Sequence, residues 1–327
     1  MGVIETLSDG FDRLRKRAWL ALVPVFIDMA LWFAPRLSID RLLRRWLPSA
    51  AEVAELGEPY VQLVEASRTF LADPNARTNV SAVFSLRAIS LPGLVGTVAT
   101  PAPPVALAES AIEVSNWLVL VGWVAGLGLL GLLAGCAFLA LLAQEARDEP
   151  LNISHALLVG VRSWLRVTAL LLAGGCVVAV LGLGVILFAV VLSSFSPRIG
   201  GVVLSGLAVS AAWTSAYVGV VFFFFVRSAV LDDLGVLRSL WSALNVVHRN
   251  LLPVLGFVIL FSLIQAGLML VWGRLSSSLA GTLLAMVGNA YVSTGLVLAS
   301  LVFYRDRFVA WQETTQPSQN GPKVQSR

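Results

Sequence analysis

The hydrophobic and polar positions divide the chain into five long runs without a charged residue and shorter polar segments between them. The uncharged runs are 114–144, 167–197, 199–226, 250–273 and 275–304. About 20 apolar residues in a helix cross the hydrocarbon core of a bilayer, and each run is at least that long. A weaker apolar segment, 18–35, contains Asp28. The pattern predicts an all-α, polytopic membrane helical bundle of six spans, at about 18–35, 117–143, 167–194, 202–226, 251–272 and 282–304.

Composition agrees with a membrane protein. The 327 residues are 57% hydrophobic and 13% charged, whereas soluble domains have about 25% charged residues. The net charge of +4 does not indicate nucleic-acid binding, because Lys and Arg lie at the ends of the apolar runs, where they anchor helices. The expected partners are membrane lipids, with another membrane protein as a further candidate and no nucleic acid.

Positive charge is uneven among the segments between the runs. Segments 144–166, 227–249 and 305–327 hold 3, 3 and 4 Lys or Arg residues, and 195–201 and 273–282 hold one each. Cytoplasmic loops carry more Lys and Arg, so the first group and both termini are predicted to be cytoplasmic. Four arginines just after 18–35 oppose this orientation, and the N-terminus would be outside if 18–35 did not span: Arg36, Arg41, Arg44 and Arg45.

Segment 36–113 is then an external insert in a single membrane domain, 1–310. Residues 88–108 are uncharged but contain Pro92, Pro101, Pro103 and Pro104. Proline interrupts helices, so this stretch is predicted to be interfacial or re-entrant, with a seventh span as the alternative. The tail, 311–327, is rich in Gln, Pro and Ser and is predicted to be disordered.

Two segments, 151–166 and 234–249, align without gaps at an offset of 83 residues. Each has the apolar periodicity of an amphipathic helix that leads into a span. The N-terminal segment ending at Arg17 has the same arrangement. We therefore predict three units, each a cytoplasmic amphipathic helix followed by a hairpin of spans. The two stripes are Leu157, Leu158, Val161, Trp164 and Leu165, and Leu237, Leu240, Trp241, Leu244 and Val247.

The run from Val230 through Asp232, Asp233 and Gly235, followed by an amphipathic helix that ends Arg249-Asn250, resembles a recurring pattern. It is similar to the multipass membrane domains of some bacterial glycerophosphodiester phosphodiesterases and of related uncharacterised proteins. The resemblance covers roughly 114–310. It implies a membrane protein of the bacterial envelope, and it implies no activity, since no phosphodiesterase domain is present. We expect its location to be the cytoplasmic membrane.

Three polar residues inside the spans are candidates for function. A carboxylate within a span is costly and commonly serves proton or ion relay, which makes Asp28 the first candidate. The alternative is structural: Asp28 pairs with an arginine or a backbone group, or caps a break after Pro24. Gln265 and Asn289 suit either hydrogen bonds between helices or substrate contact, with packing favoured.

Other patterns indicate packing rather than chemistry. Gly122, Gly126, Gly131 and Gly135 form two small-xxx-small pairs that allow close helix approach. Asp232 and Asp233 suit the N-terminal dipole of the following helix. No hydrolase triad, P-loop, HExxH or CxxC motif occurs, so we expect no cofactor, no metal site and no enzyme. The predicted function is a structural or partner subunit, and the alternative is a small transporter with a pathway near Asp28, Gln265 and Asn289.

Overall fold

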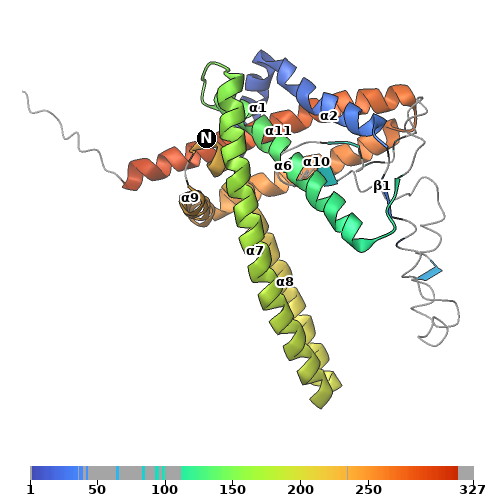
Figure 1. Ribbon diagram of the computed structural model, residues 1–327. Helices are drawn as coiled ribbons and strands as arrows, with labels where there is room; N and C mark the ends of the chain where they lie inside the picture. Colours follow the sequence, from blue (N-terminus) through green and yellow to red (C-terminus); the bar gives the residue numbers. More distant parts are fainter. Residues whose placement is uncertain are drawn as a thin grey trace, which may run out of the picture. The chain divides into compact units, whose positions relative to one another are not determined.

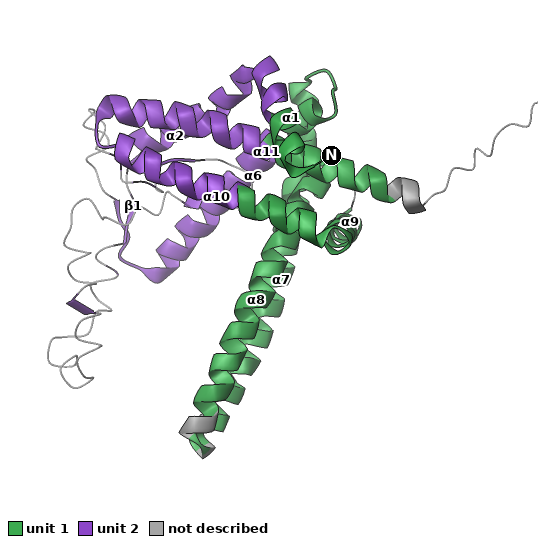
Figure 2. Cartoon of the chain, turned by 180° about the vertical axis from the view of Figure 1, so that it is seen from behind, with its two compact units in different colours: residues 1–10, 139–260, 298–327 green, residues 11–138, 261–297 purple. Residues whose placement is uncertain are grey.

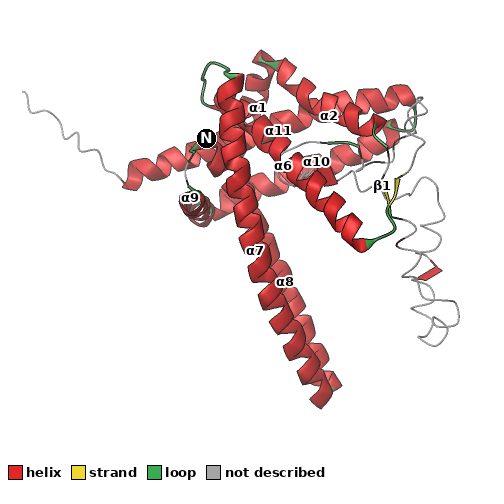
Figure 3. Ribbon diagram, in the orientation of Figure 1, coloured by secondary structure: helices red, strands yellow, loops and turns green. Residues whose placement is uncertain are grey.

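The structure, a computed structural model, consists mainly of helices over its described length, with two short strands and the loops that connect these elements (Figures 1 and 3). It describes residues 2–35, 37–39, 42, 64–65, 83–84, 93–95, 98, 100, 112–233 and 235–315. The elements are, in order, α1 (Val3–Lys16), the 3-10 helix η1 (Ala18–Ala21), α2 (Leu22–Phe33), β1 (Leu37–Ser38), β2 (Ile112–Glu113), α6 (Trp117–Ala146), α7 (Ile153–Phe195), α8 (Pro197–Leu231), α9 (Val236–Arg249), α10 (Leu251–Leu275) and α11 (Leu279–Thr315).

Among the described residues, five helices are long and apolar enough to cross a membrane: α6, α7, α8, α10 and α11. This confirms the polytopic helical fold. The first predicted span is shorter, because the apolar helix of this region covers only Ala18–Phe33, and its first turn is the 3-10 helix η1. At about 1.5 Å per residue it falls short of a hydrocarbon core of about 30 Å. A sixth crossing therefore stays a prediction.

The chain forms two compact units (Figure 2). Unit 1 comprises residues 1–10, 139–260 and 298–327, and unit 2 comprises 11–138 and 261–297. Helices α1, α6, α10 and α11 each contribute residues to both units. Residues at the ends of the predicted insert belong to unit 2, where β1 pairs in parallel with β2 through Leu37 with Ile112 and Ser38 with Glu113.

In unit 2, a segment of non-helical chain packs against helices. Gly93, Leu94 and Val95 are buried and lie outside any helix. Leu94 and Val95 share an apolar cluster with Trp32 of α2 and with Ala285 and Met286 of α11. Irregular backbone at membrane depth is tolerated where protein covers it. Here the side chains of this apolar cluster cover residues 94 and 95. The remainder of the predicted 88–108 stretch lies mostly outside the described residues.

In unit 1, α7 and α8 form a long antiparallel hairpin with only Ser196 between them (Figure 1). At the opposite end of α8, aromatic side chains fill the core. Phe303 of α11 lies 4.6 Å from the ring of Phe257 in α10 and 5.9 Å from that of Phe224 in α8. All three side chains are at most 1% exposed. These rings hold the cores of α8, α10 and α11 together.

The predicted repeat is visible as a repeated burial pattern. Four of the five buried residues of α9 have buried counterparts 83 positions earlier in α7: Ser239, Ser242, Ala243 and Val246 correspond to Ala156, Val159, Gly160 and Ser163. The large apolar residues of the two stripes are mostly exposed; Trp164, Leu240 and Leu244 are intermediate, and Val247 is buried. Both copies therefore turn a small-residue face toward the protein.

The two copies differ where the amphipathic helix meets the span. Residues 153–195 form one continuous helix, α7, whereas a break at Asn250 separates α9 from α10. Pro253 explains the break, because its ring has no N–H and clashes with the carbonyl four residues earlier, that of Arg249. Asn250 completes the end of α9 through its Nδ2, which donates to the Val246 carbonyl at 3.2 Å.

Two predicted boundaries change. The loop expected at 195–201 is reduced to Ser196, since α8 begins at Pro197 on the proline-favoured first turn. Helix α11 continues to Thr315, so residues 311–315 are helical rather than part of a disordered tail. Residues 316–327 lie outside the described chain.

Candidate functional site

Asp28 is completely buried in α2 and binds the non-helical segment of unit 2. Leu94 N–H donates to both carboxylate oxygens, at 2.8 and 2.9 Å, and Val95 N–H donates to Oδ1 at 3.1 Å. Backbone amides outside a helix need an acceptor when they are buried. The Asp28 carboxylate supplies it, which matches the structural alternative of a backbone partner.

Gln265 and Asn289 are brought together by a residue that the sequence analysis did not single out, Ser293. Gln265 Nε2 of α10 donates to Ser293 Oγ of α11 at 3.1 Å, and Ser293 Oγ donates to Asn289 Oδ1 at 3.4 Å. Asn289 and Ser293 are 0% exposed. The three side chains form a hydrogen-bonded chain from one helix to the next, the usual use of amides and hydroxyls between membrane helices.

Asp28 and Asn289 lie on helix faces that meet in one apolar cluster. Asp28 is one turn before Trp32, and Asn289 is one turn after Ala285, and both Trp32 and Ala285 belong to that cluster. Residues four apart share a helix face. Asp28 and Asn289 thus lie beside one apolar cluster of unit 2, and the hydrogen bonds through Ser293 link Asn289 to Gln265. This arrangement can hold α2, α10, α11 and residues 94–95 together.

A second polar cluster lies in unit 1, where α8 gives way to α9. The Tyr304 hydroxyl of α11 donates to Asp232 Oδ2 at 2.7 Å and lies 2.7 Å from Ser242 Oγ of α9. Because the tyrosine proton is on the Asp232 side, Ser242 is the donor in the second bond. Ser228 Oγ also donates to Asp232, at 3.4 Å. Burial raises the pKa of Asp232 to about 6, and the hydrogen bonds from Tyr304 and Ser228 and the charge of Arg147 oppose the rise.

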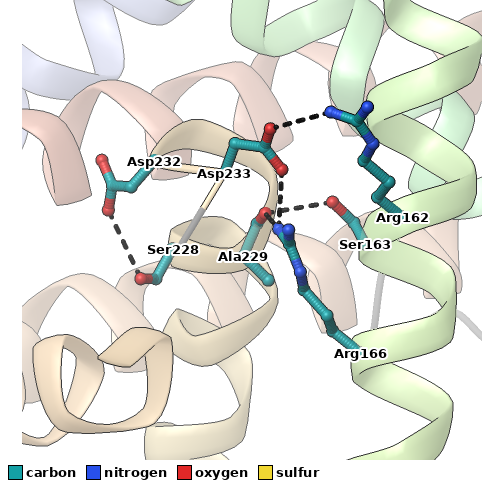
Figure 4. Close-up of polar contacts among 7 residues, drawn as sticks. All are labelled: Arg162, Ser163, Arg166, Ser228, Ala229, Asp232 and Asp233. Carbon is teal, nitrogen blue, oxygen red and sulfur yellow. Dashed lines mark hydrogen bonds and ion pairs between the residues drawn. The ribbon is translucent and has the colours of Figure 1, made fainter. Parts of the chain in front are cut away.

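The neighbouring carboxylate, Asp233, points to α7 instead (Figure 4). Arg166 Nη1 lies 2.7 Å from its Oδ1, and Arg162 Nη1 lies 3.4 Å from its Oδ2. Ser163 Oγ donates to the Ala229 carbonyl at 3.0 Å beside this ion pair. Asp233 has φ 45, a left-handed conformation that Asp tolerates better than most residues.

These contacts give Asp232 and Asp233 partners beyond the dipole of the next helix, which stays a prediction for both residues. The N-cap of α9 is Gly235, and no side chain caps it. Asp232 binds Tyr304 of α11, which also contacts Ser242 of α9, while Asp233 binds Arg166 of α7. Acidic residues before a helix are a common local pattern, so nothing in these residues indicated partners more than 60 positions away.

Arg227 is a charged residue that lies buried within a helix, which the sequence did not predict. The charge pattern predicts a cytoplasmic loop at this position, but Arg227 lies inside α8 and is 1% exposed. Its Nε donates to Ser300 Oγ at 3.1 Å, its Nη1 donates to the Phe223 carbonyl at 2.8 Å, and its guanidinium lies 3.4 Å from the Phe223 ring centroid. Charged side chains in spans face the protein interior, and Arg227 follows that rule.

The four predicted packing glycines of α6 have different surroundings. Gly131 is buried, and a Cβ there would lie 2.0 Å from the Phe84 carbonyl oxygen. Gly135 is also buried. Gly122 and Gly126 are exposed, and within the described chain nothing lies within 4 Å of a Cβ built on either. The close approach at Gly131 is made by non-helical chain rather than by a second helix.

The cysteines and the possible metal ligands were the remaining candidates for chemistry. Cys136 and Cys176 are free cysteines. In the part of the chain that the structure describes, no group of three or more His, Cys, Asp or Glu side chains is placed to hold a metal ion.

No protein-family model, curated protein or solved structure matches this chain. The resemblance to the membrane domains of glycerophosphodiester phosphodiesterases therefore rests on the residues quoted for it.

Proposed function

We propose that this protein is a non-catalytic integral membrane protein of a bacterial cytoplasmic membrane, with both termini in the cytoplasm. Its role is that of a structural or partner subunit, which binds a helix of another membrane protein. The observation that carries this proposal is the exposure of the α7–α8 hairpin. The most apolar stretch of α7 is 0% buried, against 78% for α11.

One face of α8 is better suited to packing against another helix than to contact with lipid chains. Small residues recur on it at spacings of 4, 3, 4, 3 and 4, and all are exposed: Gly201, Ser205, Ala208, Ala212, Ser215 and Gly219. We call this set the α8 seam. Small residues allow two helix backbones to approach closely, and close packing drives helix association in membranes.

The buried polar residues support a structural role in a second way. Asp28, Asn289 and Ser293 are 0% exposed and hydrogen-bonded to neighbouring groups. A solute pathway would require such groups to exchange partners with water or substrate during transport.

The test is the molecular mass of the purified full-length protein in lipid nanodiscs, compared between two adjacent substitutions. Ala208→Leu fills the α8 seam, whereas Val209→Leu, at an exposed position about 100° around the helix, leaves it open. We expect the wild type and Val209→Leu to retain a stoichiometric second subunit and Ala208→Leu to lose it. A wild type that is monomeric and without partners in nanodiscs made directly from native membranes would refute the proposal.

A second candidate function, transport, is favoured by the hydrogen-bonded chain of Gln265, Ser293 and Asn289 between two predicted spans. Water access separates the two functions. Ser293→Cys, in a background of Cys136→Ala and Cys176→Ala, should resist a water-soluble thiol reagent if the cluster is structural. Rapid labelling in intact vesicles would favour a solute pathway through unit 2.

A further inference from the structure

Helix α9 exposes its largest apolar side chains and buries its small ones. Leu237 is 81% exposed and Trp241 is 64% exposed. They lie four residues apart on one line of the helix, which Leu244 and His248 continue. The opposite face is buried: Ser239, Ser242, Ala243, Val246 and Val247. A helix on a water-soluble protein has the reverse arrangement.

Positive charge runs along one side of this exposed line. Arg238 and Arg249 are both exposed. They are 11 residues apart in sequence, which places them on the same side of an α-helix, about 100° from the line of Leu237 and Trp241. Asn245 lies between them. The exposed half of α9 thus has an apolar stripe with a cationic border.

The chain confines α9 to a membrane surface. The candidate span in α8 ends at Leu231, and the one in α10 begins at Leu251. The 14 residues of α9 extend about 21 Å, and only four residues before it and one after it connect it to the spans. Both of its ends are therefore held at the level where the bilayer meets water.

The orientation of α9 about its own axis is also fixed. Its buried face is bound to α11 by the hydrogen bond between Ser242 and Tyr304, and Tyr304 is bound in turn to Asp232 at the end of α8. With the buried face held in this way, Leu237 and Trp241 have to face outward.

We propose that α9 is a membrane-interface helix that binds an anionic phospholipid surface. Leu237 and Trp241 enter the boundary between headgroups and acyl chains, where tryptophan is enriched. Arg238 and Arg249 bind the lipid phosphates, for which arginine is well suited. The corresponding part of α7 presents the same kind of face, with Leu157, Leu158, Val161 and Leu165 between 44% and 56% exposed, which indicates that both copies of the repeat serve this purpose.

The first experiment measures depth. A spin label at Leu237→Cys, in the Cys136→Ala and Cys176→Ala background, is studied in the full-length protein in nanodiscs that contain phosphatidylglycerol. We expect the label to be more accessible to oxygen than to a water-soluble nickel complex, and a label at Arg238→Cys to show the opposite preference. Preferential access of the nickel complex at position 237 would overturn the proposal. Protection from both reagents in native membranes, with oxygen access in nanodiscs, would show that a protein covers α9 and would also overturn it.

The second experiment tests the headgroup. Thermal unfolding is compared between nanodiscs of phosphatidylcholine alone and nanodiscs with phosphatidylglycerol added. We expect phosphatidylglycerol to raise the Tm of the wild type. The double variant Arg238→Gln, Arg249→Gln should lose most of this rise, and Arg238→Lys, Arg249→Lys should keep it, because lysine retains the charge. An equal rise in the wild type and the double glutamine variant would refute the assignment of these two arginines.

Discussion

The Asp28 carboxylate and the Leu94 amide nitrogen are 2.8 Å apart although 66 residues separate them in the chain. One residue inside an apolar helix thereby fixes the position of a non-helical segment. The bond explains why a carboxylate is found in the weakest of the predicted spans: it satisfies the backbone donors of residues 94 and 95, which have no helical partner.

Asp28→Asn should lower the thermal stability of the protein in detergent. The amide keeps one oxygen acceptor, but its NH₂ group faces a backbone N–H donor, and a buried group left without its partner costs about 1–3 kcal/mol. Asp12→Asn is the control, because the Asp12 side chain is 60% exposed and should tolerate the change. A stable Asp28→Asn protein that had lost an ion- or proton-linked activity would instead identify Asp28 as a relay.

Gly131→Ala and Gly126→Ala should have different effects. A Cβ at Gly131 would meet the Phe84 backbone at 2.0 Å, whereas the site at Gly126 is open. Overpacking of this kind costs about 1–3 kcal/mol, and alanine in an open helix position is neutral or slightly stabilising. Unfolding of the two variants in the same detergent provides the measurement. Equal stabilities would show that the contact between α6 and residue 84 is not maintained in solution.

Tyr304→Phe should destabilise unit 1, since it removes the hydroxyl that joins Asp232 to Ser242. The expected loss is about 1–3 kcal/mol, because one of the two bonds is to a carboxylate. Tyr217→Phe is a matched control, as Tyr217 is 42% exposed. Denaturant titration of both variants would decide the matter, and identical midpoints would contradict the role assigned to Tyr304.

Asp232 should make the stability of the protein dependent on pH. Its pKa is raised from 3.8 to about 6 in the folded protein, so the folded state favours the protonated carboxyl. The stabilising contribution is complete below the unfolded pKa and is lost as the pH rises through about 6. Tm should therefore increase on acidification from about pH 7.5 to about pH 5 more in the wild type than in Asp232→Asn. Parallel Tm curves for the two proteins would rule this out.

Much of the fold was predictable because the bilayer imposes long apolar helices. The five spans and the repeat at an offset of 83 residues follow from uncharged runs and from periodicity alone. Pro253 was a usable signal for the break before α10, and the absence of any helix breaker near Arg166 was a usable signal for the continuity of α7.

The polar contacts were less predictable, because the partners are far apart in the sequence and because some of them are residue types that usually serve packing. Tyr304 lies in an uncharged run and looks like a packing residue until its partner, 72 positions away, is known. Ser293 looks equally ordinary in the sequence, and it joins two residues that could be named in advance, Gln265 and Asn289. The apolar stripe of α9 was predicted, but periodicity alone did not show whether this stripe faces the protein or the lipid. On this helix we propose that Leu237 and Trp241 of the stripe face lipid.

The break at Asn250 gives the two copies of the repeat different mechanical properties. A continuous helix such as α7 transmits bending and rotation from its first turns directly to its apolar part. Between α9 and α10 the helical hydrogen bonding is interrupted at Pro253, so α10 need not continue in the direction of α9. The same repeated pattern of residues thus leads once into an uninterrupted helix and once into two helices joined at a break.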